Sequence, residues 1–152
     1  MEVAEFCKRA RELFDESAEC FTVGPLVLKD SMGEHHYIAV APDADVEMPQ
    51  AFCTALEKAH KEFFDIEEYM LGIDTWQRLP GEGKEDRVSA LLIVHARLGE
   101  PSRIATVPYD LQGNMDADEI KWADDSIAFN EYIQTILETY SLELITSSRS
   151  IH

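Results

Sequence analysis

Apolar residues recur every three or four positions in three segments, a spacing that places them along one side of a helix. The first predicted helix covers residues 2–17, the second covers residues 49–71, and the third follows the capping residues Asp124 to Ser126. Pro49 at the start of the second segment suits the first turn of a helix. The third apolar stripe consists of Phe129, Ile133, Ile136, Leu137 and Tyr140.

Between these helices the pattern changes to short runs that are typical of strands. Residues 20–29 and 35–40 are predicted to form a hairpin around the turn at residues 31–34. Gly24 and Pro25 interrupt the first of these runs, and proline cannot donate a hydrogen bond to a neighbouring strand. The sequence therefore predicts an edge strand, or a strand with a bulge, at that position.

Residues 88–96 are apolar on both faces, which is typical of a central strand that is covered on both sides. Residues 103–109 follow a turn at 98–101 and are predicted to return as the next strand, with a short further strand at 119–122. Residues 79–86 combine helix breakers with charges and are expected to form a flexible loop.

The resulting order is α-β-β-α-β-β-(β)-α, with hairpins rather than βαβ crossovers. It predicts the α+β class, with a mainly antiparallel sheet of four to five strands and three packed helices. One domain over residues 1–152 is expected, with a frayed tail at 146–152. This element order is similar to that of profilin-like and roadblock-type domains, which are mostly scaffolds and sensors.

Charge narrows the range of partners. Acidic residues outnumber basic ones by 30 to 13 in the 152 residues, for a net charge of -17. Such a surface repels phosphate backbones and anionic lipids, so no direct nucleic-acid or membrane binding is expected. The sequence lacks a signal-peptide pattern and long apolar stretches, which predicts a cytoplasmic protein.

Candidate chemistry is sparse. Cys7, Cys20 and Cys53 share no C-x-x-C spacing, so they are expected to be reduced thiols without a zinc or disulfide role. Nucleotide-binding glycine loops, nucleophile elbows and the H-E-x-x-H metal motif are all absent from the sequence. No cofactor is expected, and the absence of these motifs argues against an enzyme.

Histidines supply the remaining site candidates. His35 and His36 are neighbours on a predicted strand, so they point to opposite faces and do not chelate one ion together. His95 shares a face with Leu91 and Ile93 and is expected to be a hydrogen-bonded core residue. The weak metal candidates are therefore His35, His36 and His95, and the weak catalytic candidates are His95, Asp110 and Tyr109.

Three functional hypotheses remain open. The first is a non-enzymatic interaction or scaffold module that binds a protein partner, including a second copy of itself, through an edge strand or a helix face. The second is an enzyme or sensor with a small-molecule or metal pocket between sheet and helix near His95. The third is an acidic decoy or immunity-type protein for a basic partner.

Overall fold

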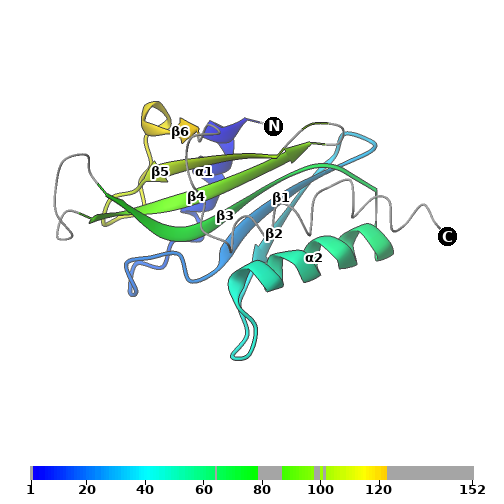
Figure 1. Cartoon of the computed structure of the whole chain (residues 1–152), viewed down its shortest axis with the longest axis horizontal. Helices are drawn as coiled ribbons and strands as arrows, with labels where there is room; N and C mark the ends of the chain where they lie inside the picture. Colours follow the sequence, from blue (N-terminus) through cyan, green and yellow to red (C-terminus); the bar gives the residue numbers. More distant parts are fainter. Residues whose placement is uncertain (1, 64, 79–86, 98–99, 101, 123–152) are drawn as a thin grey trace.

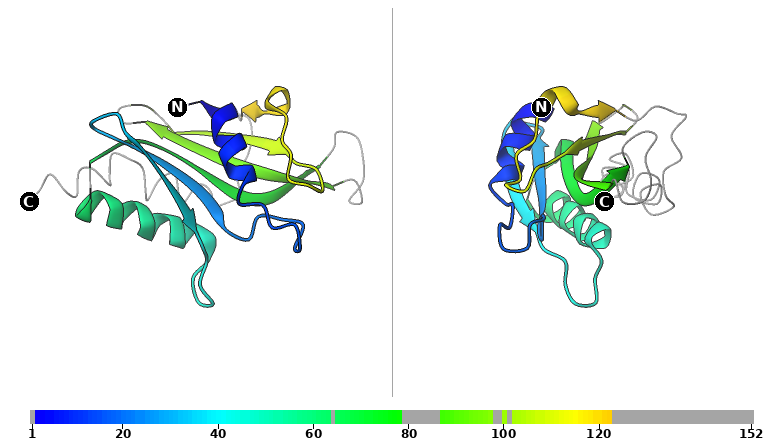
Figure 2. Two further views of the ribbon diagram at one scale, coloured as in Figure 1. Left: turned by 180° about the vertical axis from the view of Figure 1, so that it is seen from behind. Right: turned by 90° about the vertical axis from the view of Figure 1, so that its left-hand side faces the viewer.

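The computed structural model describes residues 2–63, 65–78, 87–97, 100 and 102–122, and this part of the chain forms one six-stranded antiparallel sheet with an α-helix on each face (Figures 1 and 2). The strand order is β2-β1-β3-β4-β5-β6. The elements are α1 (Val3–Arg11), β1 (Gly24–Asp30), β2 (His35–Val40), α2 (Met48–Glu62), β3 (Ile66–Arg78), β4 (Arg87–Arg97), β5 (Arg103–Pro108), the 3-10 turn η1 (Ala117–Glu119) and β6 (Lys121–Trp122). The α+β class is confirmed.

Strand β4 is the central strand that the sequence predicts. It pairs with β3 on one side and with β5 on the other. Leu91 and Ile93 belong to the core on the α1 side, and Leu92 and Val94 belong to the core on the α2 side. Both faces of β4 are thus buried, which explains why its sequence is apolar without alternation.

Each helix contributes one apolar stripe to the layer that it covers. On one face, α1 packs Phe6, Cys7 and Ala10 against the sheet. On the other face, α2 packs Phe52 and Leu56, both fully buried. The two cores lie on opposite sides of the sheet (Figure 2), so the protein has three layers.

The second predicted helix is too long at its C-terminal end. Residues 49–71 were expected to be helical, but α2 ends at Glu62 and β3 begins at Ile66. Tyr69, Met70 and Leu71 are buried between β1 and β4, because strand pairing on both sides outweighs their local helical spacing. The sheet therefore has more strands than the four to five predicted, and two α-helices lie in the described residues.

Of the two alternatives predicted for the strand with Gly24 and Pro25, the edge position is wrong, whereas the strand does have an irregularity, a register shift between Lys29 and Asp30. Strand β1 lies inside the sheet, between β2 and β3. Pro25 is tolerated because the ladder between β1 and β3 begins one residue later, at Leu26. Gly24 is required by packing, since a Cβ atom there would lie 2.2 Å from Cζ of Phe52.

The first helix is shorter than residues 2–17. It ends at Arg11, and the chain then turns around Asp15, whose carboxylate accepts hydrogen bonds from the backbone N–H groups of Ser17 and Ala18. Phe14 is still buried beyond the helix end. The predicted loop 79–86, the third helix and the tail 146–152 lie outside the described residues.

The path of the chain leaves β2 at the edge of the sheet. Strands β2 and β3 are both antiparallel to β1, so they run parallel to each other, and α2 connects them across one face. Strand β3 then pairs with β1 on the side opposite β2. Strand β2 therefore forms one edge of this sheet and β6 forms the other, and α1 lies on the face opposite α2 (Figure 2).

Candidate functional site

His95 is paired with a buried carboxylate that the sequence did not indicate. Its Nε2 lies 2.5 Å from Oε2 of Glu68 on the adjacent strand β3, and Arg97 NH2 lies 3.4 Å from the same oxygen. The Glu68 side chain is 3% exposed and that of His95 is 11% exposed. Burial alone would raise the pKa of the Glu68 carboxyl, but the hydrogen bond from His95 and nearby positive charge hold it below its ordinary value.

Tyr109 closes a second polar contact at the other end of the sheet. Its hydroxyl donates to Oδ1 of Asp74 over 2.5 Å, and the same oxygen accepts the backbone N–H of Phe21 at 3.3 Å. The Tyr109 ring packs edge-on against Phe14 and Phe21. Burial and the neighbouring Asp74 carboxylate raise the pKa of Tyr109, so its hydroxyl stays protonated at neutral pH.

Asp110 organises the loop that follows β5. One of its carboxylate oxygens accepts the backbone N–H groups of Gln112 and Asn114, both at 2.9 Å. These bonds lower the pKa of Asp110. Tyr109 and Asp110 line one groove of about 540 Å³, together with Met115 and neighbouring residues.

The structure does not bring the three weak catalytic candidates together. Tyr109 donates its backbone N–H to Ser89 near the start of β4, whereas His95 lies six residues further along that strand. At the usual rise of a strand this separates them by about 20 Å. His95 is not among the residues that line the Tyr109 groove. The arrangement gives His95 a hydrogen-bond partner in Glu68 rather than in Tyr109 or Asp110.

The histidine pair behaves as the strand period predicts. His36 lies opposite Leu28, whose side chain joins the α2-side core, and His35 lies opposite Lys29. His35 is separated from β4 by β1 and β3, which places it about 14 Å from that strand. His36 contacts Asp30, with Nε2 and Oδ2 2.8 Å apart. Sequence reasoning missed Asp30 and Glu68, each of which lies beside another charged residue in its strand and carries no distinguishing signal.

Strand β2 exposes backbone hydrogen-bonding groups at the edge of the sheet. The Asp30 N–H donates to the Glu34 carbonyl at 2.9 Å, which makes these two residues a hydrogen-bonded pair. Such pairs alternate along antiparallel strands. The N–H and C=O groups of His35, Tyr37 and Ala39 therefore point away from β1, and within the described chain no strand pairs with them.

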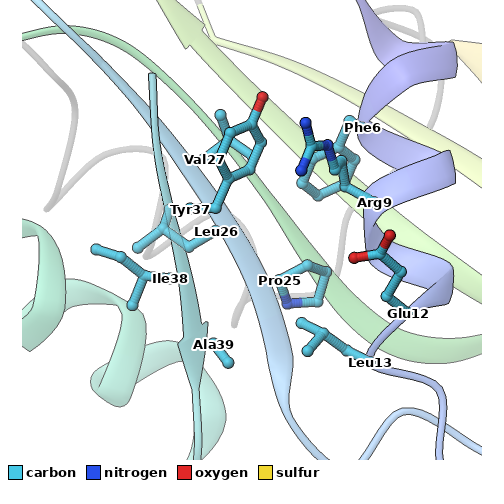
Figure 3. A pocket seen from close by; sticks show the side chains of 10 residues that line it. All are labelled: Phe6, Arg9, Glu12, Leu13, Pro25, Leu26, Val27, Tyr37, Ile38 and Ala39. Atoms are coloured by element: carbon cyan, nitrogen blue, oxygen red, sulfur yellow. The ribbon is translucent and has the colours of Figure 1, made fainter. Parts of the chain in front are cut away.

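A groove runs along this edge, between α1 and β2 (Figure 3). It has a volume of about 210 Å³. A second hollow adjoins it and shares Phe6, Val27 and Tyr37 with it. The Arg9 guanidinium lies beside the half-exposed Tyr37 ring (Figure 3), 4.5 Å from the ring centre. The other apolar side chains that line this groove from the α1 side are Phe6, Leu13, Pro25 and Val27.

The rim of this edge is acidic. The residues that line the two hollows include three glutamates, Glu2, Glu5 and Glu12, and one arginine, Arg9. Further exposed acids precede and follow β2 in the chain: Glu34, Asp43, Asp45 and Glu47. The β2 edge thus combines backbone groups that no described strand pairs with, an apolar groove and surrounding acidic residues.

The cysteines are free thiols, and two of them are unsuited to nucleophilic chemistry. Burial raises the pKa of Cys7 to about 11. Burial, reinforced by Glu57, raises the pKa of Cys53 to about 12. At neutral pH both thiols therefore remain protonated, and the thiolate is the reactive form.

Comparison of the chain with protein-family models, with curated proteins and with solved structures finds no match. None of the helices in the described residues has the length and apolar character needed to span a membrane. The site is therefore interpreted from its own geometry.

Proposed function

We propose that this protein is a non-enzymatic interaction module that binds an extended, basic segment of a partner protein along the β2 edge. The observation that carries the proposal is the row of outward-facing backbone groups at His35, Tyr37 and Ala39 beside an apolar groove. A peptide that adds a strand gains main-chain hydrogen bonds from the edge and specificity from pockets for alternate side chains.

Charge identifies the chemistry of the partner. Glu2, Glu5 and Glu12 line the hollows along α1, and the whole chain carries a net charge of -17. A segment that alternates apolar residues with lysine or arginine would place the apolar side chains in the groove and the cations against the glutamates. A second copy of the chain would meet the same negative rim, so repulsion disfavours it.

The test is selection of 12-residue peptides from a random library on the wild-type protein, followed by affinity measurement on two variants. Ala39→Pro removes one outward N–H, and its N–H takes no part in the pairing of β2 with β1. We expect the selected peptides to be rich in lysine or arginine and to lose at least about tenfold in affinity on Ala39→Pro. The thermal unfolding of that variant checks that the fold is intact.

A charge-matched pair of double variants tests the acidic rim. Glu2→Gln with Glu5→Gln removes two charges beside the groove, and Glu57→Gln with Glu62→Gln removes two exposed charges from α2 on the opposite face. We expect only the first pair to weaken peptide binding and to reduce its salt dependence. Selection of acidic or no peptides would overturn the proposal, as would a homodimer that Ala39→Pro dissociates.

A further inference from the structure

The turn between β1 and β2 brings three potential metal ligands together. The nearest ligand atoms of Asp30, Glu34 and His36 all lie within 4.8 Å of one another. They come from seven consecutive residues, so closing the hairpin assembles them. Two carboxylates and an imidazole are a mixed oxygen and nitrogen set rather than a simple acidic cluster.

The turn itself fixes the central ligand. Oδ1 of Asp30 accepts the backbone N–H groups of Met32 and Glu34, both at 2.9 Å, and this leaves Oδ2 directed at His36. Gly33, with φ of 84°, closes the loop by donating its N–H to the Asp30 carbonyl. Hydrogen bonds of this kind orient a ligand before the metal arrives.

The spacing of the donor atoms suits a small ion after a modest movement. Nε2 of His36 and Oδ2 of Asp30 lie 2.8 Å apart. With metal–ligand bonds of about 2.0–2.1 Å in a tetrahedral site, adjacent donors are roughly 3.3 Å apart. The two groups therefore need to separate by only about 0.5 Å, and the exposed Glu34 side chain is able to complete the site.

We propose that Asp30, Glu34 and His36 form a binding site for a divalent transition-metal ion of the Zn²⁺ type. The hydrogen bond between Asp30 and His36 would be replaced by two metal–ligand bonds, and water would fill the remaining coordination position. The two carboxylates balance the charge of the ion, and the net charge of -17 concentrates cations at the surface. The imidazole favours Zn²⁺ over Mg²⁺ and Ca²⁺, which prefer oxygen ligands alone.

The adjacent histidine provides a matched control. His35 is exposed, whereas His36 is half-buried; His35 lies one residue earlier and points to the opposite face of the strand. Calorimetric titration with ZnCl₂ in a Cys20→Ser background removes the half-buried thiol as a competing ligand. We expect one site per chain, with affinity reduced at least about tenfold by His36→Asn and by Glu34→Gln, and unchanged by His35→Asn.

Two further measurements make the result decisive. Glu34→Gln alters an exposed side chain, so its effect does not depend on refolding of the hairpin, and thermal unfolding without metal confirms this. Amide chemical-shift changes on adding Zn²⁺ should centre on residues 30–36. The proposal is overturned if no saturable binding occurs below millimolar Zn²⁺, or if His36→Asn binds as tightly as His35→Asn. It is independent of the peptide-binding edge, whose own test contains no metal.

Discussion

Glu68 on β3 and His95 on β4 form a hydrogen-bonded pair within the sheet, with Oε2 and Nε2 2.5 Å apart and both side chains shielded from water. The two residues are not directly opposite each other, because Glu68 pairs with Arg97 and Met70 pairs with His95. The contact is therefore diagonal, and it links the beginning of β3 to the end of β4. A buried carboxylate is tolerated because it has this partner.

Glu68→Gln should destabilise the protein, since it removes the charge that attracts His95 and Arg97 while preserving the shape of the side chain. A loss of about 1–3 kcal/mol in the free energy of unfolding is expected. Glu67→Gln is the matched control, because Glu67 is the exposed neighbour on the same strand. It should change stability by less than about 0.5 kcal/mol. Urea unfolding of the three proteins measures both effects, and equal losses would contradict the structural role of the pair.

The pair should also make stability depend on pH in the acid range. The folded-state pKa of Glu68 is below its ordinary value of 4.5, so the ionised form is favoured by folding. Its contribution is fully present above pH 4.5 and is lost as the pH falls through the lower folded-state pKa. Unfolding measured between pH 7 and pH 3 should show the difference between wild type and Glu68→Gln shrinking below pH 4.5. A difference that grows on acidification would contradict this sign.

Tyr109→Phe should remove one hydrogen bond and leave the aromatic cluster in place. The ring still packs edge-on against Phe14 and Phe21, and Asp74 still accepts the Phe21 N–H. A loss of about 0.5–1.5 kcal/mol is expected from thermal unfolding. Tyr37→Phe, at an exposed tyrosine, should leave stability nearly unchanged. If both variants behave alike, the bond between Tyr109 and Asp74 contributes nothing to the fold.

Two glycines with similar positive φ angles should respond differently to alanine. Gly33 and Gly113 have φ of 84° and 80°, so each alanine carries a strain of about 1–2 kcal/mol. No atom lies within 4 Å of a Cβ at Gly33, whereas a Cβ at Gly113 would lie 2.4 Å from Cγ of Phe14. Gly113→Ala should therefore cost roughly a further 1–3 kcal/mol. Chemical unfolding of the two variants tests this, and similar midpoints would show that Phe14 yields without cost.

The pattern of apolar and polar residues within one segment predicted the structure correctly where burial of that segment was decisive. The uninterrupted apolar run at residues 88–96 predicts a strand covered on both faces, and β4 is that strand. The alternation at His35–Val40 with a glycine-containing turn before it likewise predicts β2. The separation of His35 from His36 follows from the period of a strand alone.

The pattern of residues along the sequence did not predict which distant segments pair as strands. Ile66 to Leu71 has helical spacing but is a strand, because β1 and β4 supply hydrogen bonds on both of its sides. The same long-range pairing put β1 inside the sheet and left β2 at the edge. It also buried Glu68 beside His95, in a segment that was expected to be helical.

Composition and the periodicity of single segments were therefore enough to predict the α+β class and the central strand, and they give the excess of acidic residues directly. Only the tertiary structure shows that β2 lies at an edge of the sheet and that Asp30 and Glu68 each contact a histidine. It alone also shows which ligand atoms converge at the β1–β2 turn. These depend on strand order, register and turn geometry, which bring together atoms that no periodic pattern connects.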